Sequence, residues 1–292
     1  MKIKSLLSLT LLGSALLAGA AQPKVVAHRG YWEAPGSAQN SIRSLVKADS
    51  IGCYASEFDV WMTIDSVLVI NHDPTINGVR IEDAPAAEVL AQKLANGENV
   101  PTLDEYLKTA AGLNTRIVCE LKTHTSRSTE RACVKKILEM VKKYGLEDKV
   151  DYIVFSKDAF AEFIKKAPKG TGIQYLNGDY LPAQVKFLKG TGIDYSIKKM
   201  KKHPEWVKQC HDMGLTVNVW TVNEPEDIQW CIDQGVDYIT TNFPELCQKM
   251  IAESSHECTD GKACPEGKSC DKAGKACKKA PVHKVVATGR KK

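Results

Sequence analysis

The sequence has no apolar run long enough to span a membrane. The longest, Leu6–Leu17, has about a dozen residues, whereas a membrane-spanning helix needs about 20. Lys2 and Lys4 precede this run and Ala18-Gly19-Ala20 follow it, which predicts a signal peptide over residues 1–20. No cysteine follows closely, so a lipid anchor is not expected. We therefore expect an exported protein, periplasmic or secreted, without a transmembrane segment.

The body of the chain also lacks an excess of basic residues. Among 292 residues the net charge is +5, yet residues 253–292 hold ten Lys and Arg against five Asp and Glu, and residues 5–252 hold 28 against 30. Nucleic-acid binding needs a basic face on the folded domain, so no nucleic-acid partner is expected. We expect residues 253–292 to form a flexible tail, with at most a weak association with an anionic cell envelope.

Paired Cys-x-x-Cys motifs are absent, which argues against a zinc module. Four of the ten cysteines, separated by five or six residues, lie in the tail, where we expect a disordered or disulfide-looped appendage: Cys258, Cys264, Cys270 and Cys277. The others stand singly among apolar residues, and most are expected to be small buried side chains: Cys53, Cys119, Cys133, Cys210, Cys231 and Cys247.

Residues 22–252 alternate short β-branched or apolar runs with longer segments of helical periodicity. The predicted helices are Ser41–Ser50, Leu103–Ala111, Thr129–Tyr144, Ala159–Lys166, Pro204–Met213, Glu224–Gln234 and Pro244–Ile251. The predicted strands are Lys24–Ala27, Ser56–Val60, Val67–Asn71, Arg116–Glu120, Asp151–Phe155, Gly172–Tyr175, Ile193–Ser196, Thr216–Trp220 and Tyr238–Thr240.

This alternation predicts an α/β fold, a TIM-type (β/α)8 barrel over residues 22–252. Nine predicted strands are one too many for such a barrel. Either Ile193–Ser196, the weakest of them, is not a barrel strand, or the chain around Ile64-Asp65-Ser66 forms a hairpin. An open doubly wound sheet is the competing architecture, but no glycine fingerprint for a dinucleotide follows the first strand.

Ionisable residues gather at the ends of four successive predicted strands. His28 and Arg29 end the first and His72 the third, Glu57 and Asp59 lie in the second, and the fourth ends in Glu120-Leu121-Lys122. Residues two apart in a strand point to the same face, which in a barrel is the interior.

Carboxylates crowded in a partly dry barrel mouth need a cation, and their oxygen ligands favour Mg²⁺ or Ca²⁺ over zinc. Two histidines remain for proton transfer, and Arg29 and Lys122 can balance an anion. Together these residues suit a phosphate ester.

Eight short motifs, in order over residues 25–250, resemble the motif series of the glycerophosphodiester phosphodiesterases. They are Ala27-His28-Arg29-Gly30, Asn40-Ser41, Glu57-Phe58-Asp59-Val60, Val69-Ile70-Asn71-His72-Asp73-Pro74, Val100-Pro101-Thr102-Leu103, Glu120-Leu121-Lys122, Trp220-Thr221-Val222-Asn223 and Gly235-Val236-Asp237-Tyr238-Ile239-Thr240. The resemblance implies a phospholipase-C-like TIM barrel that uses one divalent cation to hydrolyse glycerophosphodiesters to glycerol 3-phosphate and an alcohol.

The resemblance also implies roles for individual residues. His28 and His72 match the family's acid/base pair, and Arg29 and Lys122 match groups near the phosphate. The matched metal ligands are Glu57, Asp59 and Glu120. At the end of its strand, Trp220 is placed either to pack the barrel or to form an apolar wall for the glycerol backbone.

Two positions depart from the family's usual pattern. Its Pro-Glu-Asn-Thr appears here as Ala38-Gln39-Asn40-Ser41, and its Thr-Asp-Tyr-Pro as Thr241-Asn242-Phe243-Pro244. Each change replaces a carboxylate with an amide of similar size and hydrogen-bonding capacity. We expect a lower cation affinity or the admission of a more anionic substrate.

Other interpretations stay open. The two histidines are alternatively core residues, and the acids a structural ion network with Arg29 and Lys122. His124 is expected in a solvated loop, and Asp73 is expected to bond loop backbone. For the whole protein, the alternatives are a related phospholipase of sphingomyelinase D or phosphoinositide type acting at a lipid surface, and a binding barrel whose catalysis has decayed.

Overall fold

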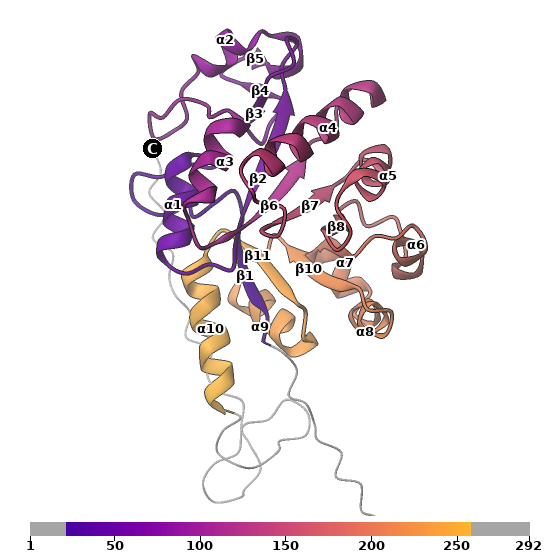
Figure 1. Ribbon diagram of the computed structural model, residues 1–292. Helices are drawn as coiled ribbons and strands as arrows, with labels where there is room; N and C mark the ends of the chain where they lie inside the picture. The colour runs from indigo at the N-terminus through magenta and orange to yellow at the C-terminus, as the bar shows by residue number, and fades with distance from the viewer. Residues whose placement is uncertain (1–21, 258–292) are drawn as a thin grey trace, which may run out of the picture. The chain divides into compact units, whose positions relative to one another are not determined.

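The computed structural model describes residues 22–257 (Figure 1). The expected signal peptide lies outside the described residues, as does the expected tail from residue 258 onward with its four cysteines. Within the described part, no helix is both long enough and apolar enough to cross a bilayer. All six cysteines of the body are buried, as predicted for most of them, and all six are unpaired among the described residues.

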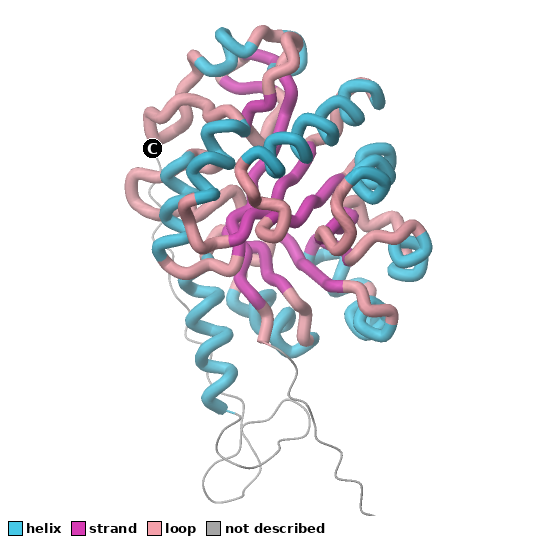
Figure 2. The backbone as a smooth tube through the Cα atoms, in the orientation of Figure 1, coloured by secondary structure: helices cyan, strands magenta, loops and turns pink. Residues whose placement is uncertain are grey.

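Eight parallel strands form a closed barrel, which confirms the predicted TIM-type fold. Each strand pairs with the next in sequence order, and the first also pairs with the last, so the sheet closes on itself. Figure 2 shows the strands at the centre with the helices outside them. The barrel strands are β1 (Lys24–Ala27), β2 (Ala55–Met62), β6 (Arg116–Leu121), β7 (Val150–Val154), β8 (Gly172–Tyr175), β9 (Gly192–Ser196), β10 (Thr216–Trp220) and β11 (Tyr238–Thr241).

The surplus predicted strand belongs to a hairpin. β3 (Leu68–Ile70) runs antiparallel to the end of β2, with Val60 opposite Ile70. The chain reverses between Thr63 and Val67, where the Thr63 N–H donates to the Val67 carbonyl at 2.9 Å. β9 is therefore a genuine barrel strand, although it was the weakest of the strand predictions.

Beyond this hairpin the chain makes a small excursion that the sequence did not predict. It comprises β4 (Thr75–Ile76), β5 (Val79–Arg80), a 3-10 turn (Ile81–Asp83) and the short helix α2 (Ala86–Leu90). A separate apolar cluster holds it together, including Trp61, Val69, Ile76, Ile81, Val89 and Val100. The excursion thus has its own small core beside β2.

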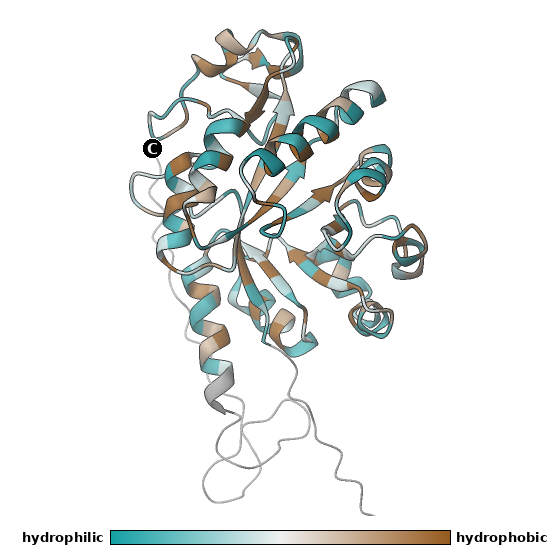
Figure 3. Ribbon diagram, viewed as in Figure 1, coloured by the Kyte–Doolittle hydropathy of each residue, from teal (hydrophilic) through white to brown (hydrophobic). Residues whose placement is uncertain are grey.

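The helices around the barrel begin at recognisable caps. The side chains of Ser41, Thr102, Ser126 and Ser156 each accept from the backbone N–H three residues on, at the start of α1, α3, α4 and α5. Figure 3 shows their mixed apolar and polar surfaces. The helices are α1 (Ile42–Ser50), α3 (Leu103–Ala111), α4 (Arg127–Lys143), α5 (Lys157–Lys166), α6 (Pro182–Phe187), α7 (Ile197–Lys202), α8 (Glu205–Asp212), α9 (Pro225–Gln234) and α10 (Pro244–Glu257). The sequence did not predict α6 and α7, which have only six residues each.

The strand register stacks the inward side chains in layers, with alternate strands contributing to each layer. One layer contains Val26, Val118, Gln174 and Asn218. The next, toward the carboxyl ends of the strands, contains Glu57, Ile153, Asp194 and Thr240. The one above contains His28, Glu120, Leu176 and Trp220. Polar and ionisable groups therefore accumulate toward one end of the barrel.

A tight turn after β1 shapes this end of the barrel. Arg29 and Gly30 both have positive φ, at 57° and 75°. A Cβ on Gly30 would lie 2.3 Å from the Ser44 Oγ of α1, so no other residue fits without displacing that helix. Ser44 Oγ in turn donates to the Arg29 carbonyl at 3.1 Å. The turn and α1 thus fix each other.

We expect Gly30→Ala to lower the free energy of unfolding far more than Gly52→Ala. Gly52 also has positive φ, but a Cβ added there would meet no atom within 4 Å, so its substitution costs only backbone strain, about 1–2 kcal/mol. At Gly30, overpacking adds about 1–3 kcal/mol. Urea unfolding of both variants measures the difference, and equal losses would contradict the packing argument.

Candidate active site

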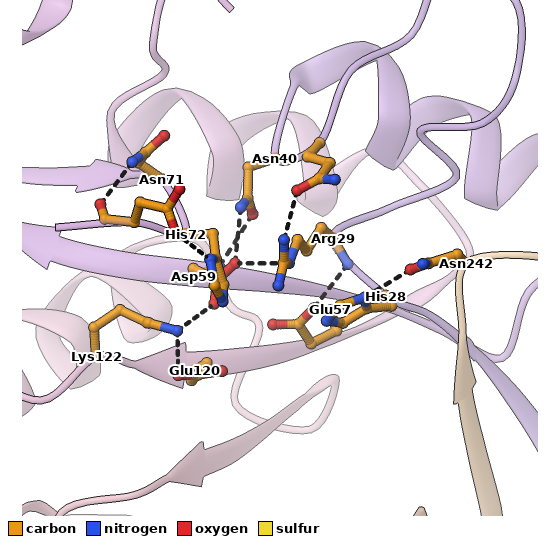
Figure 4. Close-up of polar contacts among 12 residues, drawn as sticks. His28, Arg29, Asn40, Glu57, Asp59, Asn71, His72, Glu120, Lys122 and Asn242 are labelled. Carbon is orange, nitrogen blue, oxygen red and sulfur yellow. Dashed lines mark hydrogen bonds and ion pairs between the residues drawn. The ribbon is translucent and has the colours of Figure 1, made fainter. Parts of the chain in front are cut away.

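A pocket opens at the carboxyl ends of the barrel strands. One side is ionic and is lined by His28, Arg29, Glu57, His72, Glu120 and Lys122. The opposite side is mostly apolar and is lined by Ile153, Phe155, Leu176 and Trp220, with Asp194 of β9 among them, and Thr240 of β11 lies between the two sides. Asp59 lies beside Glu57 and Glu120 (Figure 4). The structure thus brings all the predicted site residues to one place.

Three buried carboxylates form the centre of the ionic side. Glu57, Asp59 and Glu120 each place an oxygen within 4.8 Å of the others. Glu57 and Asp59 point inward from β2, and Glu120 is the register partner of Asp59 on β6. Their closeness follows from the period-two pattern and from the pairing of two adjacent strands.

The electrostatics of this cluster fit a divalent cation. Burial, and then the charges of Asp59 and Glu120, raise the pKa of Glu57 well above its usual range. Burial and the charge of Asp59 raise the pKa of Glu120 to about 7. Among the described residues nothing hydrogen-bonds Glu57 Oε1. Three carboxylates, with Glu57 Oε1 buried and without a hydrogen-bond partner in the described part of the chain, match the oxygen ligands that hard divalent cations prefer.

Two residues with left-handed backbone hold the carboxylates. The Arg29 N–H donates to Glu57 Oε2 at 2.7 Å. Asn40, whose φ is 60°, donates from Nδ2 to Asp59 Oδ2 at 2.8 Å and accepts the Asp59 N–H at 3.1 Å. Sequence reasoning did not place Asn40 in the site, although Asn40-Ser41 is one of the family-like motifs.

Lys122 and Arg29 supply the positive charge. Lys122 Nζ lies 2.7 Å from Glu120 Oε1 and 3.2 Å from Asp59 Oδ1. Burial opposes its charge, but Asp59 and Glu120 more than compensate and raise the pKa of Lys122. Arg29 Nη1 donates to Gln39 Oε1 at 2.6 Å. Gln39, the first departure from the family pattern, therefore keeps a hydrogen bond to this guanidinium.

The two histidines lie in different environments. The Nδ1–H of His28 donates to Asn242 Oδ1 at 2.7 Å, and burial together with Arg29 lowers the pKa of His28 to about 4. The Nδ1–H of His72 donates to Asp73 Oδ1, also at 2.7 Å, and burial is the main cause that lowers the pKa of His72. The Asp73 carboxylate thus contacts a ring and not, as expected, the loop backbone.

The prediction for His124 is wrong. The ring is buried, with Nδ1–H donating to the Lys122 carbonyl at 2.7 Å and Nε2 accepting the Met62 N–H at 3.0 Å. It is enclosed because the chain after β6 packs under the β2–β3 hairpin, a long-range contact without a local sequence signal. His124 therefore links the backbone of Lys122 to β2.

Trp220 forms part of the apolar side of the pocket. Its Nε1–H donates to the Asp194 carbonyl at 2.8 Å. Its ring meets Phe155 edge-on, with the ring centroids 5.7 Å apart. The indole therefore lines the pocket and also packs against the apolar side chains of the barrel interior.

Comparisons with known proteins agree with this geometry. The model of the glycerophosphoryl diester phosphodiesterase family matches residues 28–246. A crystal structure of a glycerophosphodiester phosphodiesterase from Parabacteroides distasonis is 47% identical, with a TM-score of 0.80 over 81% of this chain and 100% of that one.

Curated relatives extend the comparison. The glycerophosphodiester phosphodiesterase of Caldanaerobacter subterraneus is 27% identical over 78% of this chain and 97% of its own length. That of Bacillus subtilis is 25% identical over 77% and 85%. The family match covers most of the barrel, and it includes every residue of the ionic side of the pocket. The chain therefore belongs to the glycerophosphoryl diester phosphodiesterase family.

Proposed function

We propose that this protein hydrolyses glycerophosphodiesters to glycerol 3-phosphate and an alcohol, with one divalent cation and two histidines. Membership of the family makes the chain a phosphoric diester hydrolase; the cation and the proton-transfer roles are our proposal. The observation that carries it is the single pocket in which a buried three-carboxylate cluster lies beside His28, His72 and two cationic side chains.

Glu57, Asp59 and Glu120 would hold the cation, either Mg²⁺ or Ca²⁺. When bound, such a cation supplies positive charge that polarises the phosphoryl group and offsets negative charge developing in the transition state. Asn40 orients the Asp59 carboxylate, and the Arg29 N–H orients the Glu57 carboxylate, through hydrogen bonds that do not require a bound cation.

Arg29 and Lys122 bind and orient the phosphate. Both are partly enclosed at the pocket, where a charge-assisted hydrogen bond to a phosphoryl oxygen is stronger than in water. The opposite wall, with Trp220 and Phe155, offers an apolar surface to the carbon chain of the substrate. The ionic wall thus binds the phosphate and the apolar wall contacts the carbon chain, so together they orient the diester in the pocket.

The hydrogen bonds of the histidines support distinct roles. Because the Nδ1–H of His28 donates to Asn242 Oδ1, the Nε2 atom of His28 has a free lone pair, and the low pKa of His28 keeps the ring neutral. His28 accepts the proton of the attacking hydroxyl as its oxygen bonds to phosphorus. Attack by water gives glycerol 3-phosphate directly, whereas attack by the glycerol 2-hydroxyl gives a cyclic phosphate that water then opens. The Asp73 carboxylate favours the protonated form of His72 and so opposes the effect of burial on its pKa. Protonated His72 donates its proton to the leaving alkoxide as the P–O bond breaks.

We expect glycerol 3-phosphate release from a panel of glycerophosphodiesters to depend on an added divalent cation. Chelation should abolish turnover, because it removes the positive charge that polarises the phosphoryl group and compensates the three carboxylates. Added Mg²⁺ or Ca²⁺ should restore turnover. Full turnover after exhaustive chelation would refute the metal proposal. Activity on lipid vesicles but not on soluble diesters would indicate the phospholipase alternative, and diester binding without product would indicate a decayed barrel.

His28→Ala and His72→Ala should each reduce kcat by about 10²–10⁴-fold, the usual contribution of one proton transfer. Both variants should remain folded, as judged by circular dichroism and urea unfolding. His203→Ala is a matched control, since His203 stacks on Trp206 away from the pocket. Near-normal turnover in either pocket variant would remove that histidine from the mechanism.

Asn242→Asp should move the acidic limb of the kcat/KM profile to higher pH. A carboxylate in place of the amide raises the pKa of His28, by about 1 or more, and a base that is protonated at higher pH is inactive there. Asn242→Leu removes the hydrogen bond that favours the protonated ring, so it should move the limb the opposite way. Identical profiles for all three proteins would exclude His28 as the base.

A further inference from the structure

Asp194 is a buried acid at the pocket that the proposed mechanism does not use. It points inward from β9, in the same side-chain layer as Glu57 and, since β9 lies opposite β2 in the barrel, across the interior from it. Its side chain lines the pocket and the residue is 1% exposed. Among the described residues nothing hydrogen-bonds its Oδ1 atom.

The neighbours of Asp194 are polar but engaged elsewhere. Gln174 Nε2 donates to Thr216 Oγ1 at 3.2 Å, and Thr240 Oγ1 donates to Asn218 Oδ1 at 3.0 Å. None of these donors is directed at Asp194. A buried carboxyl oxygen without a hydrogen-bond partner in the protein is uncommon, and it indicates that a bound molecule supplies the partner.

The position of Asp194 indicates what that group is. Glu120 and Lys122 lie on one side of the pocket, and Phe155 and Trp220 form the apolar wall on the other. The Trp220 Nε1–H donates to the Asp194 backbone carbonyl, so the indole lies beside the backbone of Asp194, whose side chain lines the same pocket. A carbon chain that packs on the indole would therefore lie near the part of the pocket that the Asp194 side chain lines.

The chemistry of the side chain agrees with a hydroxyl ligand. Burial, and then the charge of Glu120, raise the pKa of Asp194 well above its usual range. A protonated carboxyl both donates and accepts a hydrogen bond, as an alcohol does. A cationic ligand would instead need Asp194 to be ionised, which burial and the charge of Glu120 both oppose.

We propose that Asp194 hydrogen-bonds the terminal hydroxyl of the glycerol arm and thereby selects diesters that carry this hydroxyl. This inference rests on the proposed function, because it assigns one subsite of the same pocket. Asp194 acts in binding and specificity and takes no part in proton transfer to the leaving group.

The test combines a change in the enzyme with a change in the substrate. Glycerophosphocholine is compared with its analogue in which the terminal hydroxyl is replaced by hydrogen, with the 2-hydroxyl retained. In the wild-type protein we expect kcat/KM to fall by about 10- to 100-fold on removal of this hydroxyl, as for the loss of a hydrogen bond to a buried group. In Asp194→Leu both substrates should be turned over at the same, lower kcat/KM.

Two further variants separate binding from packing. Gln174→Leu makes the same kind of substitution one layer deeper, outside the pocket lining, and should keep the full preference for the hydroxyl. Asp194→Asn keeps size and hydrogen bonding, so it should keep part of the preference, and it serves if the leucine variant does not fold. A preference that is absent in the wild type, or unchanged in both Asp194 variants, would overturn the proposal.

A binding measurement distinguishes this failure from failure of the proposed function. Calorimetry compares glycerol 3-phosphate with propane-1,2-diol 1-phosphate, its analogue without the terminal hydroxyl, on the full-length wild type and on each Asp194 variant. Tighter binding of glycerol 3-phosphate that disappears in Asp194→Leu supports the assignment even if no diester is hydrolysed. Equal binding of the two ligands by the wild type would reject it even if hydrolysis proceeds.

Discussion

The mutual repulsion of Glu57, Asp59 and Glu120 is the constraint on which the rest of the site depends. Oxygens within 4.8 Å of one another cost about 3 kcal/mol for each charged pair at an effective dielectric constant of about 20. Lys122 offsets part of this cost through its contacts with Asp59 and Glu120. Burial first, and then the like charges that Lys122 does not offset, raise the pKa of Glu57 and of Glu120. A divalent cation at the cluster would compensate both effects.

A strained backbone holds this charge in place. Arg29 and Asn40 both have left-handed backbone conformations. Each costs of order 1–3 kcal/mol and persists because the surrounding structure enforces it. The enforcement comes from α1, since Ser44 donates to the Arg29 carbonyl and the Asn40 N–H donates to the same residue's carbonyl at 3.0 Å. The orientation of Glu57 and Asp59 on β2 thus depends on the packing of the first helix against the turn after β1.

The barrel and the residues of the site could be predicted from the sequence, but the contacts that each site residue makes could not. Strand alternation and period-two spacing are local, so they predicted β2, β6 and the inward direction of Glu57, Asp59 and Glu120. The β2–β3 hairpin is a local feature that the sequence offered as one of two explanations for the surplus strand. The burial of His124, by contrast, depends on a contact with Met62, 62 positions away, and the six-residue helices α6 and α7 are too short to show periodicity. The bond between His28 and Asn242 joins residues 214 positions apart, which no local pattern encodes.

The two amides that replace the family's usual carboxylates explain how the site tolerates its crowding. Gln39 contacts Arg29 and Asn242 contacts His28, so each keeps a hydrogen bond while it adds no negative charge. A carboxylate at either position would neutralise Arg29 or favour a protonated His28. With amides there, the positive charge of Arg29 remains available to a phosphate and His28 remains neutral. The two amides therefore preserve what the proposed anion-binding role of Arg29 and the proposed base role of His28 require. They alter the charge balance around the carboxylates rather than the proposed metal ligands.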